Sequence, residues 1–109
     1  MGALYYDQSA VGIRDNQIGV PDECILFPAY PNPFNPRTTI EFDLPKSSEV
    51  TLKIFNLLGE EIATLLSTSL LSGSYSVDWS RSAGIASGVY LYRLQAGDYV
   101  ETRKMVLMR

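Results

Sequence analysis

The side chains that most often carry enzyme chemistry are scarce in this sequence. It contains no histidine, so the commonest general base and metal ligand are missing, and no Ser–His or Cys–His pair can form. The single cysteine, Cys24, follows Asp22 and Glu23, and negative charges raise the pKa of a thiol instead of activating it. We therefore expect Cys24 to be an incidental residue and not a nucleophile.

Two groups of acidic residues have both a chemical and a structural interpretation. Asp15 and Asn16 lie between glycines and could contribute to a calcium site, but the EF-hand spacing and a closing acidic residue are absent. Glu60 and Glu61 are adjacent, and adjacent residues of a strand face opposite sides, so they cannot share a proton. These patterns favour a solvated turn and charged strand positions. The sequence therefore predicts no metal site and no catalytic pair of carboxylates.

The glycines and the overall charge exclude further classes of protein. Gly84, Gly88 and Gly97 have neither the spacing nor the strand-to-helix transition of a phosphate-binding loop, so we expect no cofactor. A net charge of -3 with nine scattered basic residues argues against nucleic acid as a partner. No apolar run has membrane-spanning length, and the N-terminus does not resemble a signal peptide. If the domain is exported, we expect this chain to be part of a longer protein.

A proline-rich run divides the chain into two parts. Residues 30–36 read YPNPFNP, and prolines fix φ, lack an N–H group and favour extended geometry in the preceding residue. The run predicts a stiff entry into a β module, with Phe34 anchoring the first strand. Residues 1–27 have the composition of a linker or of the tail of an upstream domain. We expect the compact domain to span residues 28–109.

Behind the prolines, apolar and polar residues alternate with the period of half-buried strands. The pattern predicts six strands, over residues 39–44, 50–54, 60–66, 75–79, 89–96 and 99–108. The strand over 89–96 is apolar on both faces, so we expect it to be central. The alternative is a helix over residues 56–71, where leucines recur at helical spacing, but Gly59 and the Ser/Thr run 67–69 weaken it. The strand spacing is typical of a small β-sandwich.

Aromatic side chains in three of these strands, including Tyr99 of the last one, could form a sugar-binding platform, and those of two strands could instead form part of the core. Trp79 and Tyr75 share a face with Val77, and Tyr90 and Tyr92 share a face in the following strand. Aromatic residues that alternate with polar ones beside aliphatic neighbours are typical of the core of a small domain. We therefore expect these four side chains to be buried.

The last strand has two interpretations that the residues themselves leave open. Residues 102–109 read TRKMVLMR and combine apolar residues with basic ones near the chain end. They could simply close the sandwich. Alternatively, they could present an accessible strand edge and a cationic tip to another protein, in the manner of strand addition.

Five blocks of the sequence together carry a resemblance to a known family. They are YPNPFNP (30–36), VTLKIFNLLGEEI (50–62), SGSYSVDW (72–79), SGVYLYRLQAG (87–97) and TRKMVLM (102–108). In this order they resemble the type IX (Por) secretion system C-terminal sorting domain, over roughly residues 28–109. The immunoglobulin-like domain of flagellar hook-capping proteins has similar blocks, but there the domain is internal.

The resemblance implies an all-β fold, a small immunoglobulin-like antiparallel β-sandwich of about seven strands. It implies a non-enzymatic domain that follows its cargo domain in a longer protein and directs it through the periplasm to the outer-membrane translocon. The implied partners are the type IX secretion machinery and a surface sortase, and the implied location is the cell surface or the medium. An immunoglobulin-like adhesion or carbohydrate-binding module and a structural spacer are the alternatives.

The resemblance also implies which residues the translocon recognises. They lie in the last two blocks of the sequence: Gly88, Tyr90, Lys104, Met105, Val106, Leu107 and Met108. Arg109 stands where lysine is common in the family, which keeps the charge. We therefore expect recognition at the C-terminal end of the domain.

Overall fold

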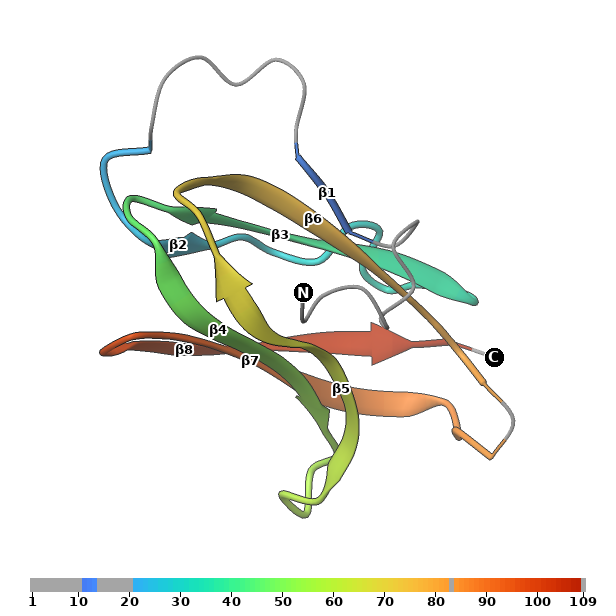
Figure 1. The fold of residues 1–109 in the computed structure, drawn as a ribbon. Coiled ribbons are helices and arrows are strands. Elements are labelled where there is room, and N and C mark those ends of the chain that lie inside the picture. The colour runs from blue at the N-terminus through green and yellow to red at the C-terminus, as the bar shows by residue number, and fades with distance from the viewer. Residues whose placement is uncertain (1–10, 14–20, 83, 109) are drawn as a thin grey trace.

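The computed structural model describes residues 11–13, 21–82 and 84–108, which form two antiparallel sheets packed against each other (Figure 1). The strands are β1 (Val11–Ile13), β2 (Ile25–Leu26), β3 (Arg37–Leu44), β4 (Ser48–Phe55), β5 (Glu61–Leu70), β6 (Gly73–Ser80), β7 (Gly88–Ala96) and β8 (Tyr99–Leu107). The first sheet has the order β1-β6-β3-β2, and the second has the order β5-β4-β7-β8. The predicted all-β sandwich of about seven strands is confirmed, with β2 as an additional strand of only two residues.

Alternating side chains explain why these segments pair and stack. In β3, Ile40, Phe42 and Leu44 are fully buried, and the apolar positions of the facing strands are buried in the same way. Their inner faces form one core that contains apolar side chains from both sheets, as expected for sandwiches. β7 lies between β4 and β8, so the prediction that it is a central strand is confirmed.

The aromatic residues expected in the core are buried. Trp79, Tyr75 and Tyr90 are each 7% exposed, and Tyr92 is fully buried. The Trp79 ring centroid lies 5.7 Å from that of Phe34 and 5.9 Å from that of Tyr90. Such tilted and edge contacts between rings are favourable beyond the area that they bury.

The prediction for the third strand is correct in type and wrong in length. β5 runs from Glu61 to Leu70, through the polar residues 67–69 that were expected to end it, and it excludes the helix considered for residues 56–71. The reason is its pairing with β4, which continues to Ser48↔Leu70. One face of an antiparallel sheet can be solvated, so an edge strand such as β5 needs few apolar side chains.

Two short segments of the expected linker pair with the first sheet. Val11–Ile13 pair with β6, and Ile25–Leu26 pair with Asp43 and Phe42 of β3. The Leu26 side chain is fully buried and belongs to the core. The division of the chain at residues 27 and 28 stays a prediction.

Candidate recognition site at the terminal strands

The structure brings together the residues that the family resemblance assigned to recognition. β7 and β8 form one antiparallel hairpin in which Gly88 pairs with Leu107 and Tyr90 pairs with Met105. Lys104 precedes Met105, Val106 lies between Met105 and Leu107, and Met108 directly follows the last strand. The hairpin turns at Gly97, whose φ of 59° is in the left-handed region that glycine adopts easily.

Three of these residues point into the core. Met105 is fully buried, Leu107 is 1% exposed, and Tyr90 is 7% exposed and donates a hydrogen bond to the Ala86 carbonyl at 2.6 Å. Because successive residues of a strand face opposite sides, the neighbouring side chains of Lys104 and Val106 face outward. The inward residues contribute to the stability of the hairpin and are not accessible to a partner in the folded domain.

The outward face contains residues that were not assigned to recognition from the sequence. Val89 pairs with Val106 and Leu91 pairs with Lys104, and both apolar side chains are half-buried. Together with Met108 they form a surface that we call the outer strip, made up of Val89, Leu91, Lys104, Val106 and Met108. The signal in the sequence was the apolar character of residues 89–96 on both faces, which correctly indicated a central strand.

The proline-rich run lies along the free edge of β8. The Phe34 amide donates to the Val106 carbonyl at 2.9 Å, and the Met108 amide donates to the Phe34 carbonyl at 2.8 Å. The Asn32 side chain accepts from the Val106 amide at 2.9 Å and donates to the Lys104 carbonyl at 3.4 Å. We call residues 30–36 the proline strap.

The strap joins the two sheets. Tyr30 exchanges two backbone hydrogen bonds of 2.9 Å with Thr39 of β3, and Phe34 forms a parallel bridge with Leu107 of β8. The Phe34 side chain is 2% exposed. Phe34 belongs to the same core as the apolar residues of β3, and the expectation that it anchors this strand stays a prediction. Its bridge to the last strand was not predicted, because a register between distant segments cannot be derived from local sequence.

Further hydrogen bonds hold the segment before the strap against β7 and β8. Tyr92 donates from its hydroxyl to the Phe27 carbonyl at 2.9 Å, and Arg103 donates from Nε to the Leu26 carbonyl at 2.8 Å. Arg103 also forms an ion pair of 3.4 Å with Glu101. These contacts fix the path of the chain from β2 toward the strap.

The environments of Tyr99 and Cys24 disfavour ionisation. Burial raises the pKa of Tyr99 to about 12, and its hydrogen bond to Glu101 acts in the same direction. Burial is also the main cause that raises the pKa of the Cys24 thiol, and the negative charges of Asp43 and Glu101 raise it further. The direction expected for Cys24 is confirmed, but its main cause is burial and not the neighbouring acidic residues of the sequence.

The acidic residues considered for chemistry have separate partners or lie outside the described residues. Glu60 accepts from Asn56 Nδ2 at 2.6 Å, whereas Glu61 pairs with Lys53 at 3.3 Å, so the two do not share a proton. Asp15 and Asn16 lie outside the described residues. Within the described ranges, no three His, Cys, Asp or Glu residues lie close enough to hold a metal ion.

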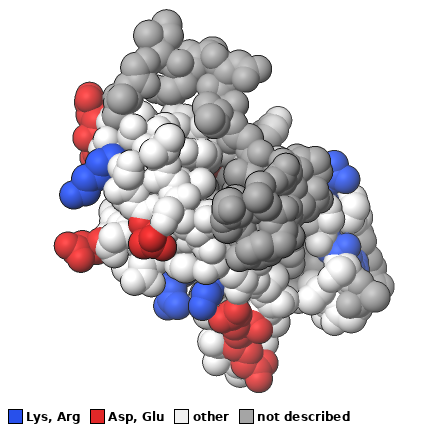
Figure 2. Space-filling view, viewed as in Figure 1, with Lys and Arg blue, Asp and Glu red and all other residues white. Residues whose placement is uncertain are grey.

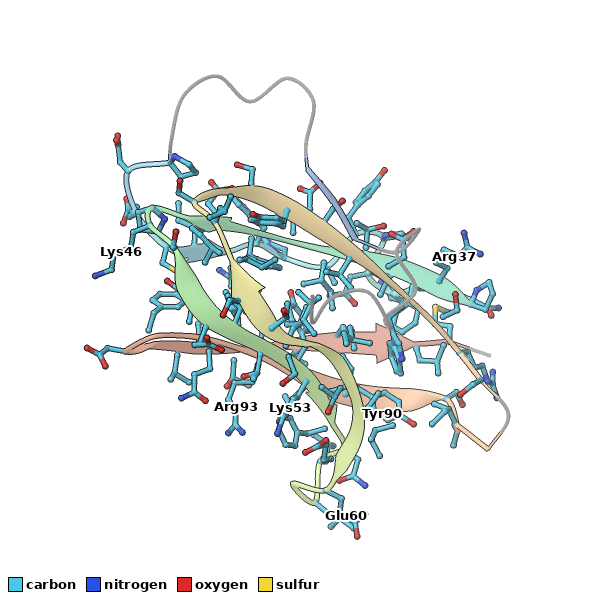
Figure 3. The ribbon with its side chains drawn as sticks, viewed as in Figure 1. Arg37, Lys46, Lys53, Glu60, Tyr90 and Arg93 are labelled. Carbon is cyan, nitrogen blue, oxygen red and sulfur yellow. The ribbon has the colours of Figure 1, made fainter. Side chains whose placement is uncertain are left out.

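Charges on the face shown in Figure 2 occur in small groups of both signs, without a broad field of either sign. On the outward side of the second sheet, Arg93 and Lys53 project away from the first sheet (Figure 3). The Arg93 guanidinium carbon lies 4.6 Å from the centroid of the Phe55 ring, a cation–π distance. In the part of the chain that the structure describes, there is no helix long and apolar enough to cross a membrane.

The fold and the hairpin define a small antiparallel β-sandwich domain whose last strand is covered along its edge by an upstream segment of the same chain. The family model of the secretion system C-terminal sorting domain matches residues 28–108. Since this match covers most of the sequence, the chain belongs to that family. A search of the curated proteins found no match to this chain.

Proposed function

We propose that this domain is a type IX secretion signal that directs a cargo protein, N-terminal to it in the same polypeptide, through the outer-membrane translocon. The observation that carries the proposal is the family match over residues 28–108. The gathering of the assigned recognition residues in one hairpin supports it. In this proposal residues 1–27 connect the cargo to the sorting domain, and the domain itself catalyses no reaction.

The proposal includes the route and the destination of the cargo. The cargo crosses the periplasm, engages the type IX machinery through residues at the C-terminal end of the domain, and reaches the cell surface or the medium. A surface sortase then removes the domain and attaches the cargo. Membership of the family supports this route and destination.

The direct test uses the full chain fused behind an inert reporter that carries its own signal for export to the periplasm. In a host with type IX secretion, we expect the reporter at the cell surface or in the medium. Deleting Lys104–Arg109 should leave it in the periplasm, and a host strain without the translocon provides the matched control. Undiminished export without the last residues, or equal export in the control strain, would overturn the proposal.

The competing functions make different predictions in the same experiment. A structural spacer would leave the reporter in the periplasm with or without the last residues. A carbohydrate-binding module would need an exposed aromatic platform, but Trp79 and Tyr75 are each only 7% exposed. Among the described residues, this pair therefore gives no support to sugar binding.

A further inference from the structure

We propose that the export machinery binds the outer strip of the terminal hairpin through side chains, and does not add a strand to the edge of β8. This inference rests on the proposed function and specifies the surface and the chemistry of the partner. The partner is a protein surface with apolar side chains flanked by Asp or Glu.

The C-terminal end of the free edge of β8 is already occupied by the proline strap. Strand addition requires backbone N–H and C=O groups that point away from the sheet. At the end of β8 these groups are the Val106 amide and carbonyl, the Lys104 carbonyl and the Met108 amide, and each bonds to Asn32 or Phe34. A partner strand could pair there only by displacing the proline strap.

Displacing the strap would disrupt the core. Phe34 is 2% exposed and its ring packs against Trp79, so removing the strap transfers a large apolar side chain into water. Fully burying such a side chain contributes about 1.5–3 kcal/mol. The backbone bonds between Tyr30 and Thr39 would be strained or lost as well.

The outer strip remains accessible in the folded domain. Val89, Leu91 and Val106 are half-buried, and Met108 is 52% exposed. Cross-strand pairing places Val89 directly beside Val106, so their side chains form a continuous apolar surface. Contiguous apolar surface beside the exposed Met108 provides contact area for a complementary protein surface.

The charge beside the outer strip is positive. Among the outward residues of β7 and β8, the charged side chains are Arg93 and Lys104, and both are positive. The nearest outward cation of β4, Lys53, is paired with Glu61. In a protein with a net charge of -3, this local positive character favours an acidic partner and sets the orientation of binding.

A protein partner fits the strip better than a lipid surface. Three of the four apolar side chains of the strip, Val89, Leu91 and Val106, are half-buried in the sheet, and Met108 alone among them is mostly exposed. Insertion into a bilayer needs apolar groups that extend several ångströms beyond the polar surface. The strip is therefore suited to contact with a complementary protein surface.

The test changes the strip without changing the fold, in the full chain fused to the reporter described above. The variant V106T/M108Q keeps the β-branched shape at 106 and removes apolar character, and K104E reverses the charge. We expect export to fall on the order of tenfold or more in each, equivalent to about 1.4 kcal/mol of binding. Thermal unfolding should show that the variants remain folded.

The matched control is V100T. Val100 lies on the same face of the same strand, is 53% exposed and pairs with Gln95 at the other end of the hairpin. V100T should be exported as well as the unchanged chain. An equal fall in V100T would indicate a general effect on the strand and would contradict the inference.

A second variant distinguishes binding at the outer strip from strand addition at the edge of β8. N32A removes the side-chain bonds to the Val106 amide and the Lys104 carbonyl and so exposes part of the edge. If the partner binds the face, export of N32A should stay within about twofold of the unchanged chain. Increased export of N32A, with V106T/M108Q exported normally, would overturn the inference and favour strand addition.

The outcomes separate this inference from the function on which it rests. If the unchanged chain is not exported, the proposed function fails and the inference fails with it. If the unchanged chain and the strip variants are exported equally, only the inference fails. In a separate assay, the purified domain is mixed with phosphatidylglycerol vesicles. If it binds them, if V106T/M108Q abolishes that binding and if export is unaffected, the strip binds a lipid surface and not a protein partner.

Discussion

The second sheet has two edge strands, and they avoid pairing with other chains in different ways. β5 pairs with β4 through two register shifts, between Leu52 and Lys53 and between Ile54 and Phe55. β8 pairs with β7 in unbroken register from Ala96↔Tyr99 to Gly88↔Leu107. Bulges twist an edge away from pairing, whereas a regular edge must be covered. The proline strap provides that cover for the end of β8.

The difference in edge protection matches a difference in side chains. Leu66 is the one residue of β5 that is fully buried, and the exposed positions of that strand are polar. β8 instead ends in the buried residues Met105 and Leu107. The end of β8 therefore depends on distant residues for its order, whereas β5 is protected by its own sequence. Substitutions in the strap should therefore have larger effects than substitutions near β5.

The largest expected effect is that of F34A. Phe34 is 2% exposed and packs against Trp79, so truncation leaves a cavity and should lower the free energy of unfolding by about 3–5 kcal/mol. Chemical denaturation measures this loss. The control is L58A, because Leu58 is 84% exposed in the β4–β5 turn and its truncation should change stability by only about 0.5 kcal/mol or less. Equal losses in the two variants would contradict the role of the strap.

The next effect is that of N32A, which keeps Phe34 in place. Losing the bonds to the Val106 amide and the Lys104 carbonyl should cost about 1–2 kcal/mol and increase hydrogen exchange at Val106. N32D keeps an acceptor for the Val106 amide and serves as the control, with more of the protection retained. Unchanged exchange at Val106 in N32A would show that the strap does not protect this edge.

A smaller effect is expected on the other side of the sheet. Asn56 shapes the β4–β5 turn, since its Oδ1 accepts from the amides of Leu58 at 2.9 Å and Glu60 at 3.0 Å. N56A should cost about 1 kcal/mol, because the turn is exposed and water replaces part of these bonds. Exchange should increase at Leu58 and stay unchanged at Val106. Increased exchange at Val106 would mean that the two edges are coupled.

Much of the sandwich could be predicted because its signals are local. Alternation in segments such as Ile40–Leu44 indicates both a strand and its inward face, and aromatic residues on such faces are buried. The end of β5 was misplaced because the polar residues 67–69 carry no strand signal of their own and are kept extended by β4. Local pattern therefore predicts which residues face inward better than it predicts where an edge strand ends.

The strap could not be predicted because it depends on contacts between distant positions. Asn32 and Val106 are 74 residues apart in sequence, and no local propensity encodes their contact. For the recognition site, the resemblance provided the residues, and strand alternation then separates the inward Met105 from the outward Val106. Val89 and Leu91 were missed because cross-strand neighbours follow from register, which the sequence does not fix by itself.

The smallest expected effect concerns the ion pair beside β5. Hydrogen bonding from Thr64 Oγ1 at 2.7 Å lowers the pKa of the Glu61 carboxyl, and Lys53 at 3.3 Å acts in the same direction. A carboxyl whose pKa is lower in the folded state stabilises the fold above its ordinary value of 4.5, and this contribution is lost as the pH falls. The melting temperature of E61Q should therefore lie slightly below that of the unchanged chain at pH 7, with the difference vanishing in acid.

The source of this small effect can be tested by removing the partners of Glu61 separately. The Thr64 bond is the largest single cause, whereas Lys53 acts through both a hydrogen bond and its charge, so T64V and K53Q should each reduce the pH-dependent effect of E61Q on the melting temperature. A larger reduction in T64V would make the Thr64 bond dominant. A larger reduction in K53Q would instead make the ion pair dominant. In all of these variants hydrogen exchange at Val106 should be unchanged, because the bonds that protect β8 come from the strap on the opposite edge of the sheet.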